Sequence, residues 1–379
     1  MNAKRLATRF AQAILCAGAL WLEACSDALP VTPLQPLKSS VAMDVVWKNK
    51  VGASGNAVLA PVLYKDTLYL ATEQGDLMAL DPATGKESWH IKTKEPFSAG
   101  IGVGEDLLFL GNKKGELLAY SLKGELVWRA QQSSELTAPP EAAEGTVVTR
   151  TADGHIVGLN VADGKRRWQV TRPQPALVLR GVSGITVGRG GALVGLPGGK
   201  LLALNLADGS VVWEATISVS KGATELERVN DVLGAPIVGF QDVCTASYQG
   251  KTTCLEVARG QTIWSKDEAA IGPIFADGNK LFVTDEKGDV VALNRLSGTT
   301  AWRNEVLEGR YLSAPAVTTD YVIVGDAEGI VHFLSRADGI ESGRAATGGT
   351  AITQPPLVIG DNLVLVRNRD GKVFAVGPR

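Results

Sequence analysis

Short apolar runs alternate with polar turns along nearly the whole chain, and residues 73–89 (EQGDLMALDPATGKESW) show the unit most clearly. The pattern predicts a glycine turn at 74–75, a buried strand at 77–80, a second turn at 81–85 and a last strand that ends on Trp89. Two strands and two turns of this size cannot bury their own faces. The unit is therefore expected to stack on copies of itself.

Copies of this unit follow one another at a nearly constant spacing. The glycine turn recurs at 114–115, 153–154, 198–199, 249–250, 287–288, 328–329 and 370–371. Gly75 and Gly371 are 296 residues apart over seven intervals, a mean period of about 42 residues. That length suits four short strands per repeat, which is the composition of a β-propeller blade.

The final strand of most copies carries a tryptophan, and the exceptions indicate how the ring closes. The tryptophans are Trp89, Trp128, Trp168, Trp213, Trp264 and Trp302. Gly343 stands in this position in the seventh copy, and the eighth copy ends before its last strand. Residues 44–48 look like that missing strand, with Trp47 in the tryptophan position. We therefore predict an all-β, eight-bladed propeller over 44–379, closed by pairing the N-terminal strand with the last blade.

The first residues have a different character from the repeats. Lys4, Arg5 and Arg9 precede an apolar stretch at 11–22, which is the pattern of a secretory signal peptide. We assign residues 1–24 to this signal. Residues 25–43 contain three prolines and favour an extended tether between the signal and the propeller.

Cys25 is the candidate attachment point for a lipid. The stretch at 22–25 (Leu-Glu-Ala-Cys) resembles a bacterial lipobox, although Glu23 occupies a position that is usually small or apolar. The resemblance implies lipidation of Cys25, and the Ser26 that follows implies sorting to the periplasmic face of the outer membrane of a Gram-negative bacterium. The alternative is ordinary signal cleavage, with Cys25 left as a free thiol.

Two other cysteines flank the fifth glycine turn. Cys244 and Cys254 stand at near-equal distances from residues 249–250, so a hairpin would bring them onto facing strands. An oxidising compartment would then permit a cross-strand disulfide. Two small buried thiols are the alternative, because a shift of one residue in register would place the side chains on opposite faces.

Chemistry typical of enzymes or metal sites is absent from the sequence. The three histidines, His90, His155 and His332, occupy unlike places in three repeats, which favours surface or strand positions over metal ligation. The formal net charge is −2 and no long charged run occurs, which argues against nucleic acid as a partner. We predict no catalytic residue, no metal and no cofactor.

Two intervals are longer than the rest and define a candidate binding surface. They are 45 residues (Gly154 to Gly199) and 51 residues (Gly199 to Gly250), with the additions at 173–181 and 221–232. Strand alternation places both additions on the face of the disc that carries the glycine turns. Their apolar and charged residues suit a protein contact. Alternatively, Leu177 and Leu179 are strand residues that point into a blade.

The repeat at 79–89 resembles the A-x-D-x-x-T-G-x-x-x-W motif of quinoprotein dehydrogenases and their non-enzymatic relatives. Over its whole length the chain is most similar to the BamB family, the lipoprotein propellers of the outer-membrane β-barrel assembly machinery. This resemblance implies a non-enzymatic scaffold that binds the periplasmic domains of the barrel subunit and assists the folding and insertion of outer-membrane proteins. Free blade edges are further expected to bind unfolded outer-membrane proteins by β-augmentation.

The same resemblance implies which residues touch the partner. The family segments L-x-L-R-G and E/D-R-x-x-D-V match this chain at 177–181 and 227–232, and point to Leu177, Leu179, Arg180, Glu227, Arg228 and Asp231. A second acidic position of the family is Leu233 here, so the contact is expected to be less polar, or Glu225 or Glu227 replaces that acid. Two alternative functions remain at this point: a pyrroloquinoline-quinone-type dehydrogenase and a small-ligand-binding periplasmic propeller.

Overall fold

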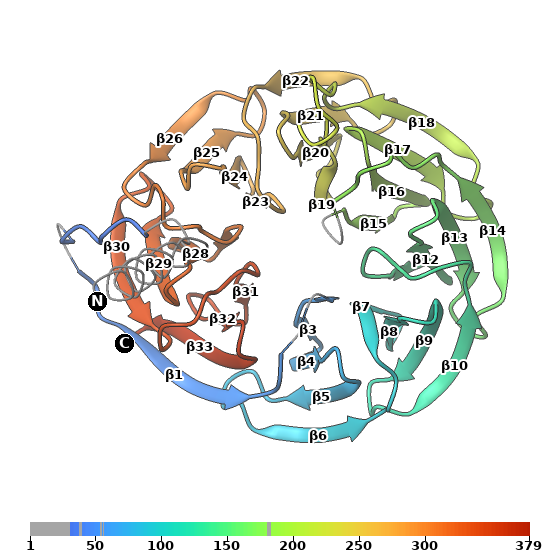
Figure 1. Ribbon diagram of the computed structural model, residues 1–379, viewed down its shortest axis with the longest axis horizontal. Coiled ribbons are helices and arrows are strands. Elements are labelled where there is room, and N and C mark those ends of the chain that lie inside the picture. The colour runs from blue at the N-terminus through green and yellow to red at the C-terminus, as the bar shows by residue number, and fades with distance from the viewer. Residues whose placement is uncertain (1–30, 38–39, 54, 56, 180–182) are drawn as a thin grey trace, which may run out of the picture. The chain divides into compact units, whose positions relative to one another are not determined.

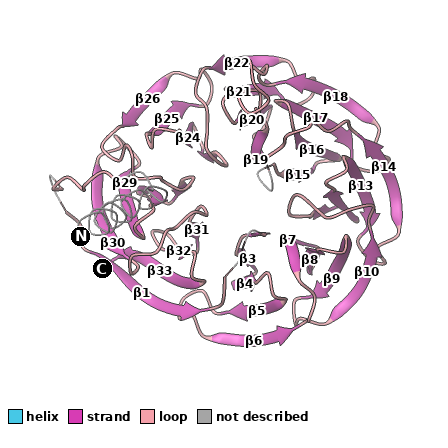
Figure 2. Ribbon diagram, in the orientation of Figure 1, coloured by secondary structure: helices cyan, strands magenta, loops and turns pink. Residues whose placement is uncertain are grey.

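Each repeat of the sequence forms one antiparallel sheet, and the sheets are arranged around a ring (Figure 1). The computed structural model describes residues 31–379 except 38–39, 54, 56 and 180–182. Within these residues there are eight sheets, and Figure 2 shows that strands and loops make up all of the ring. The eight-bladed propeller predicted from the repeat is confirmed.

The first four blades follow the chain in order, each from the inner to the outer strand. Blade 1 contains β3 (Val62–Tyr64), β4 (Thr67–Ala71), β5 (Asp76–Leu80) and β6 (Glu87–Lys92). Blade 2 contains β7 (Phe97–Gly104), β8 (Leu107–Asn112), β9 (Glu116–Ser121) and β10 (Leu126–Gln131), and the short β2 (Val58–Leu59) pairs with β7 in parallel. Blade 3 contains β11 (Glu141–Ala143), β12 (Thr146–Arg150), β13 (His155–Asn160) and β14 (Arg166–Thr171). Blade 4 contains β15 (Ile185–Gly188), β16 (Gly191–Leu196), β17 (Lys200–Asn205) and β18 (Val211–Thr216).

The remaining blades complete the ring. Blade 5 contains β19 (Val232–Val238), β20 (Asp242–Ser247), β21 (Thr252–Glu256) and β22 (Thr262–Lys266). Blade 6 contains β23 (Phe275–Asp277), β24 (Lys280–Thr284), β25 (Val290–Asn294) and β26 (Thr300–Asn304). Blade 7 contains β27 (Ala316–Val317), β28 (Tyr321–Gly325), β29 (Ile330–Ser335) and β30 (Glu341–Ala346). Blade 8 contains β31 (Leu357–Val358), β32 (Val364–Arg367), β33 (Lys372–Pro378) and, as its outer strand, β1 (Met43–Lys50).

Ring closure uses the two ends of the propeller, as the sequence predicted. β1 pairs antiparallel with β33 from Met43 opposite Pro378 to Lys50 opposite Lys372. The outer strand of blade 8 therefore comes from the start of the chain and its other three strands from the end. This pairing covers strand edges that would otherwise be open.

Tryptophans of the outer strands join every blade except blade 7 to the next blade. Among the described residues, seven indole Nε1–H groups donate to a backbone carbonyl in the turn between the third and fourth strands of the following blade, at 2.7 to 3.1 Å. The indole also lies flat against the glycine of that turn. A Cβ atom on Gly85 would stand 2.3 Å from Cε3 of Trp47, and Gly85 has a φ of +69°. Only glycine therefore fits beneath the ring.

Residue size is balanced between the third and fourth strands in every blade. A small residue lies opposite each tryptophan, as in the pairs Ala79 with Trp89 and Gly158 with Trp168. Blade 7 reverses the order, because Phe333 lies opposite Gly343. The next blade explains why. β33 and β1 are not joined by a turn, so an indole on β30 would have no turn to stack on.

Candidate functional site

Both long insertions lie on one face of the ring, called here the linker face. It carries the glycine turns between second and third strands and the linkers that join one blade to the next. The first linker starts where the Arg172 N–H donates to Gly154 O at 2.9 Å, and the second where the Ile217 N–H donates to Gly199 O at 2.7 Å. The linkers run from β14 to β15 and from β18 to β19, so they are neighbours on blades 3 to 5 (Figure 1).

The first linker presents apolar side chains to solvent. Leu177 and Val178 are 47% and 42% exposed, and the segment is not a strand. Leu179 packs in part against buried residues of blades 5 and 6. The alternative that Leu177 and Leu179 both point into a blade is therefore wrong, since β15 begins only at Ile185. Arg180 lies outside the described residues.

The second linker is held in shape by its own charged residues. The Glu227 carboxylate accepts the N–H groups of Ala223 and Thr224 at 2.7 and 3.1 Å, in the manner of a helix cap. Arg228 donates to the carbonyls of residues 222 and 223. Both charges are therefore used inside the linker. Its exposed apolar side chains are Val219 and Leu226, which are 72% and 70% exposed.

Asp231 joins the two linkers from within the protein. Its side chain is buried, and its carboxylate accepts the Leu179 N–H at 2.6 Å and the Gly198 N–H at 3.2 Å. Burial raises the pKa of Asp231, while these two bonds and the charge of buried Arg150 oppose the rise. The residue thus contacts the first linker and the glycine turn of blade 4, and its carboxylate is not presented to solvent.

The need for Asp231 arises from a difference between blade 4 and the other blades. In seven described glycine turns, the residue three before the glycine has a polar side chain that accepts the N–H four residues later: Thr72, Asn112, Thr151, Ser247, Asp285, Asp326 and Asn368. Blade 4 has Leu196 in this position. In blades 2, 6 and 7 the N–H of the residue just before the turn glycine is bound by a carboxylate or amide of the same turn. In blade 4 the equivalent N–H belongs to Gly198, and Asp231 of the second linker binds it.

The cysteine pair lies in the core of blade 5. Cys244 and Cys254 stand directly opposite each other on β20 and β21 and form a disulfide, with their Cα atoms 4.1 Å apart. Asp242 lies near both sulfur atoms, and within the described residues this is the one grouping of three potential metal ligands. The sulfurs are bonded to each other and the Asp242 carboxylate accepts Arg295 Nε at 2.7 Å, so the group does not fit a metal. Cys25 lies outside the described residues.

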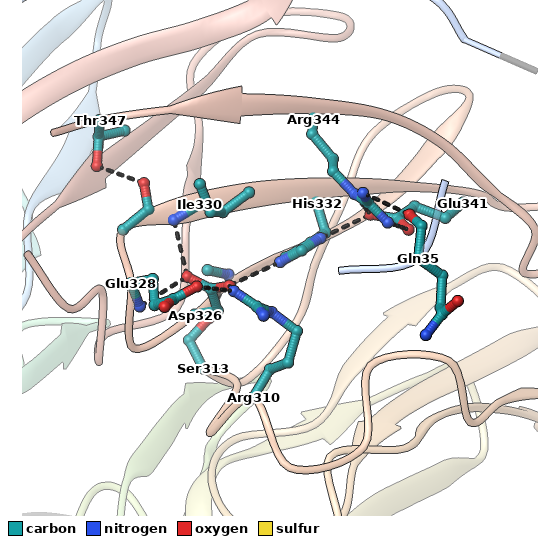
Figure 3. Close-up of polar contacts among 12 residues, drawn as sticks. Gln35, Arg310, Ser313, Asp326, Glu328, Ile330, His332, Glu341, Arg344 and Thr347 are labelled. Atoms are coloured by element: carbon teal, nitrogen blue, oxygen red, sulfur yellow. Dashed lines mark hydrogen bonds and ion pairs between the residues drawn. The ribbon is translucent and has the colours of Figure 1, made fainter. Parts of the chain in front are cut away.

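A buried charge network in blade 7 was missed by the sequence analysis. His332, expected at the surface or on a strand, is on β29 and fully buried. Its Nε2 lies 3.0 Å from Asp326 Oδ2 and its Nδ1 2.6 Å from Glu341 Oε1 (Figure 3). A neutral imidazole has one N–H, so it satisfies one carboxylate at most. Two facing carboxylates therefore favour the doubly protonated ring.

The network continues in both directions from the imidazole. On one side Asp326 accepts Arg310 Nε at 2.8 Å, and buried Arg310 also reaches Glu328 at the linker face. On the other side Glu341 accepts Arg344 Nε at 2.6 Å. Burial alone would lower the pKa of His332, but the two carboxylates outweigh it and raise the pKa above its ordinary value. The signal in the sequence was the placement of His332 inside an apolar strand.

Comparison with known proteins shows the same architecture over the whole chain. A family model described as "Outer membrane protein assembly factor BamB" matches residues 73–304 and 270–379, and the "Glucose/ethanol/alcohol dehydrogenase, beta-propeller domain" matches residues 40–102. The outer membrane protein assembly factor BamB of Bordetella pertussis is 35% identical over 371 residues, 96% of each chain. That of Burkholderia pseudomallei is 34% identical over 380 residues, 99% of this chain and 100% of its own.

Solved structures agree with these relatives. The crystal structure of BamB from Moraxella catarrhalis superposes with a TM-score of 0.79 at 25% identity, covering 89% of this chain and all of that one. The quinohemoprotein alcohol dehydrogenase of Comamonas testosteroni, with a TM-score of 0.68 at 13% identity over 88% of this chain and 76% of its own, shares the fold alone. Because the family model covers most of the chain and full-length relatives are about one third identical to it, this chain belongs to the BamB family of outer membrane protein assembly factors.

Proposed function

We propose that the chain is held at the outer membrane by a lipid on Cys25 and binds the periplasmic domains of the barrel subunit through its two long linkers. As a member of a family of assembly factors it is a non-enzymatic component, and its likeness to dehydrogenases lies in the propeller repeat and the fold. Its contribution is to hold partners together during the assembly of outer-membrane proteins.

The observation that carries this proposal is the pair of linkers, which expose apolar side chains on a shared face. Leu177, Val178, Val219 and Leu226 are all more than 40% exposed. Apolar side chains ringed by charge are typical of the centre of a protein interface. Exposed apolar side chains in the linkers between blades do not stabilise the fold. Their presence therefore favours a contact with a partner protein.

The predicted site residues form two groups, one that contacts the partner and one that shapes the linkers. Leu177 and Arg180 contact the partner. Leu179, Glu227, Arg228 and Asp231 set the shape of the linkers, since their side chains or backbone groups are engaged inside the protein. Substitution in the second group therefore weakens binding through the linker conformation.

Affinity for the purified periplasmic domains of the barrel subunit tests the proposal. We expect Leu177→Asp and Arg180→Glu to weaken binding by tenfold or more, because a charge then faces the apolar or acidic surface of the partner. Leu296→Asp is the matched control, since Leu296 is 76% exposed in a turn of blade 6 away from both linkers. Wild-type affinity in the Leu177 and Arg180 variants would rule out this surface. Mass spectrometry of the mature protein tests lipidation of Cys25.

A further inference from the structure

The outer strand of blade 7 is covered by residues that precede the propeller. The described residues 34–37 and 40–42 are called here the strap. The Gln35 carbonyl accepts Arg344 Nη1 at 2.8 Å, and the Val41 N–H donates to the Ser342 carbonyl at 2.8 Å. Figure 3 shows Gln35 beside Arg344. The strap therefore makes backbone contacts with β30 before the chain enters β1.

The missing tryptophan of blade 7 provides the room for this contact. A Cβ atom on Gly343 would stand 2.7 Å from Met43 Cγ and 2.8 Å from the Val41 carbonyl oxygen. An indole at this position would thus collide with the strap and with the first residue of β1. Gly343 leaves open the space that the N-terminal segment occupies.

The charge network holds Arg344 in the orientation that the strap requires. Glu341 binds Arg344 through both carboxylate oxygens, and Nδ1 of His332 binds Oε1 of the same carboxylate. Arg344 is 17% exposed. The equivalent residue of blade 2, Arg129, directly follows Trp128, is 48% exposed and belongs to a strand that no strap covers among the described residues. A fixed guanidinium loses less freedom on binding a carbonyl than a mobile one.

We propose that the rim of blade 7 is the docking site of the chain's own anchor segment and fixes the side of the ring from which the lipid anchor leaves. This rests on the proposed lipidation of Cys25. Nine residue steps separate Cys25 from Leu34, a reach of at most about 30 Å. The length of the tether therefore limits how far a lipid on Cys25 can lie from the strap. The long linkers belong to blades 3 to 5, across the ring (Figure 1). They are thereby presented on the side away from the attachment point, toward periplasmic domains.

Limited trypsin digestion of the full-length lipoprotein in detergent tests the docking, because the sequence places Lys38 between the two described parts of the strap. We expect slow cleavage after Lys38 in the wild type and at least tenfold faster cleavage in Gly343→Trp, which fills the space, and in Arg344→Gln, which removes the bond to Gln35. Arg129→Gln is the matched control and should digest like the wild type.

The outcomes separate the docking from the anchor. Cleavage after Lys38 at one rate in all four proteins overturns the docking. Should Gly343→Trp fail to fold, as judged by circular dichroism, Arg344→Gln against Arg129→Gln decides alone. The N-terminal tryptic fragment is weighed by mass spectrometry. A fragment without acyl chains overturns the proposed anchor, and with it the orientation of the ring, while protection of Lys38 would still establish the docked strap.

Discussion

Blade 4 and blade 7 both depart from the repeat, blade 4 in the turn between its second and third strands and blade 7 on its outer strand. Blade 4 lacks the polar residue that caps its glycine turn, and Asp231 of the second linker supplies the missing acceptor. Blade 7 lacks the tryptophan of its outer strand, and the strap and Met43 fill the space. In each case a segment outside the repeat completes the blade.

The two blades differ in the part of the chain that the completing segment belongs to. Asp231 ties the first linker and the glycine turn of blade 4 to the second linker, so under the proposed function the departure in blade 4 serves binding. The strap ties the N-terminal segment to the rim, so under the proposed lipidation the departure in blade 7 serves attachment. In these two blades a missing consensus residue marks the place where a non-repeat segment docks. A missing polar residue marks a turn, and a missing tryptophan marks an outer strand.

The largest expected effect is in blade 7. His332→Gln leaves Asp326 and Glu341 facing an uncharged amide, so at pH 6 we expect the free energy of unfolding to fall by about 3 kcal/mol or more. Urea unfolding of wild type and variant measures it. His90→Gln, which changes an exposed histidine on blade 1, should cost much less. A His332→Gln variant as stable as the His90→Gln variant would show that the network does not stabilise blade 7.

The same substitution should show a defined dependence on pH. Because the folded pKa of His332 is raised, its contribution to stability is fully present below the ordinary value of about 6.5 and is lost as pH rises through the raised pKa. The imidazole faces Asp326 and Glu341, with Arg310 and Arg344 behind them. The difference between wild type and His332→Gln should therefore shrink as the pH increases above 6.5. A difference that grows with pH would contradict a cationic His332.

Phe333→Ala should come next, at about 3–4 kcal/mol. Phe333 is fully buried and lies opposite Gly343, so truncation leaves a cavity that Gly343, which has no side chain, cannot fill. Thermal and urea unfolding measure the loss. Phe240→Ala is the control, since Phe240 is 85% exposed. Equal stability of the two variants would show that size is not balanced across this pair.

Asp231→Ala is expected to cost about 2–3 kcal/mol, because two partly buried N–H groups lose a charged acceptor. Amide hydrogen exchange should speed up at Leu179 and Gly198, the two donors. Asp267→Ala, at a side chain that is 82% exposed, should change stability by no more than about 0.5 kcal/mol. If exchange at Leu179 were unchanged, the two linkers would not be joined through Asp231.

The smallest effect concerns blade 5, which keeps Trp264 but places Cys254 opposite it. Replacing Cys244 and Cys254 together by alanine removes the disulfide, and we expect a loss of about 2 kcal/mol. Alanine is the residue that several other blades use opposite the tryptophan, so packing is retained. Thiol labelling of the unreduced, denatured wild type should find neither cysteine reactive. Two reactive thiols would show that the bond does not form in the isolated protein.

Most of the fold was predictable because its signals are local and repeated. Glycine turns mark every blade and tryptophans mark every blade but the seventh, and the position of Trp47 revealed how the ring closes. Even the exception at Gly343 was visible. The residue that fills the space was not, because Met43 lies 300 residues away in the chain and reaches Gly343 only once the ring has closed.

The site was predictable to a lesser degree. The spacing of the repeats located both long linkers, and the family resemblance pointed to Asp231. Asp231 is buried because it binds the glycine turn of blade 4, where Leu196 provides no polar side chain. A pattern within one linker carries no information about that turn. His332 was grouped with exposed His90 and half-buried His155 because few sequence features separate a buried from a surface imidazole. Its apolar neighbours Val331 and Phe333, which are both buried, were the sequence feature that indicated a buried histidine.

The pairing of β1 with β33 also sets an order of events during synthesis. β1 is made first, yet its partner is among the last residues translated, with Lys50 opposite Lys372. At about 5–20 residues per second the first strand waits roughly 15–65 s for its partner. A chain that stops before Lys372 lacks β33, so the backbone edge of β1 that β33 covers stays unpaired. Closure of the ring therefore depends on the last strand that is made, and a truncated product keeps an open strand edge.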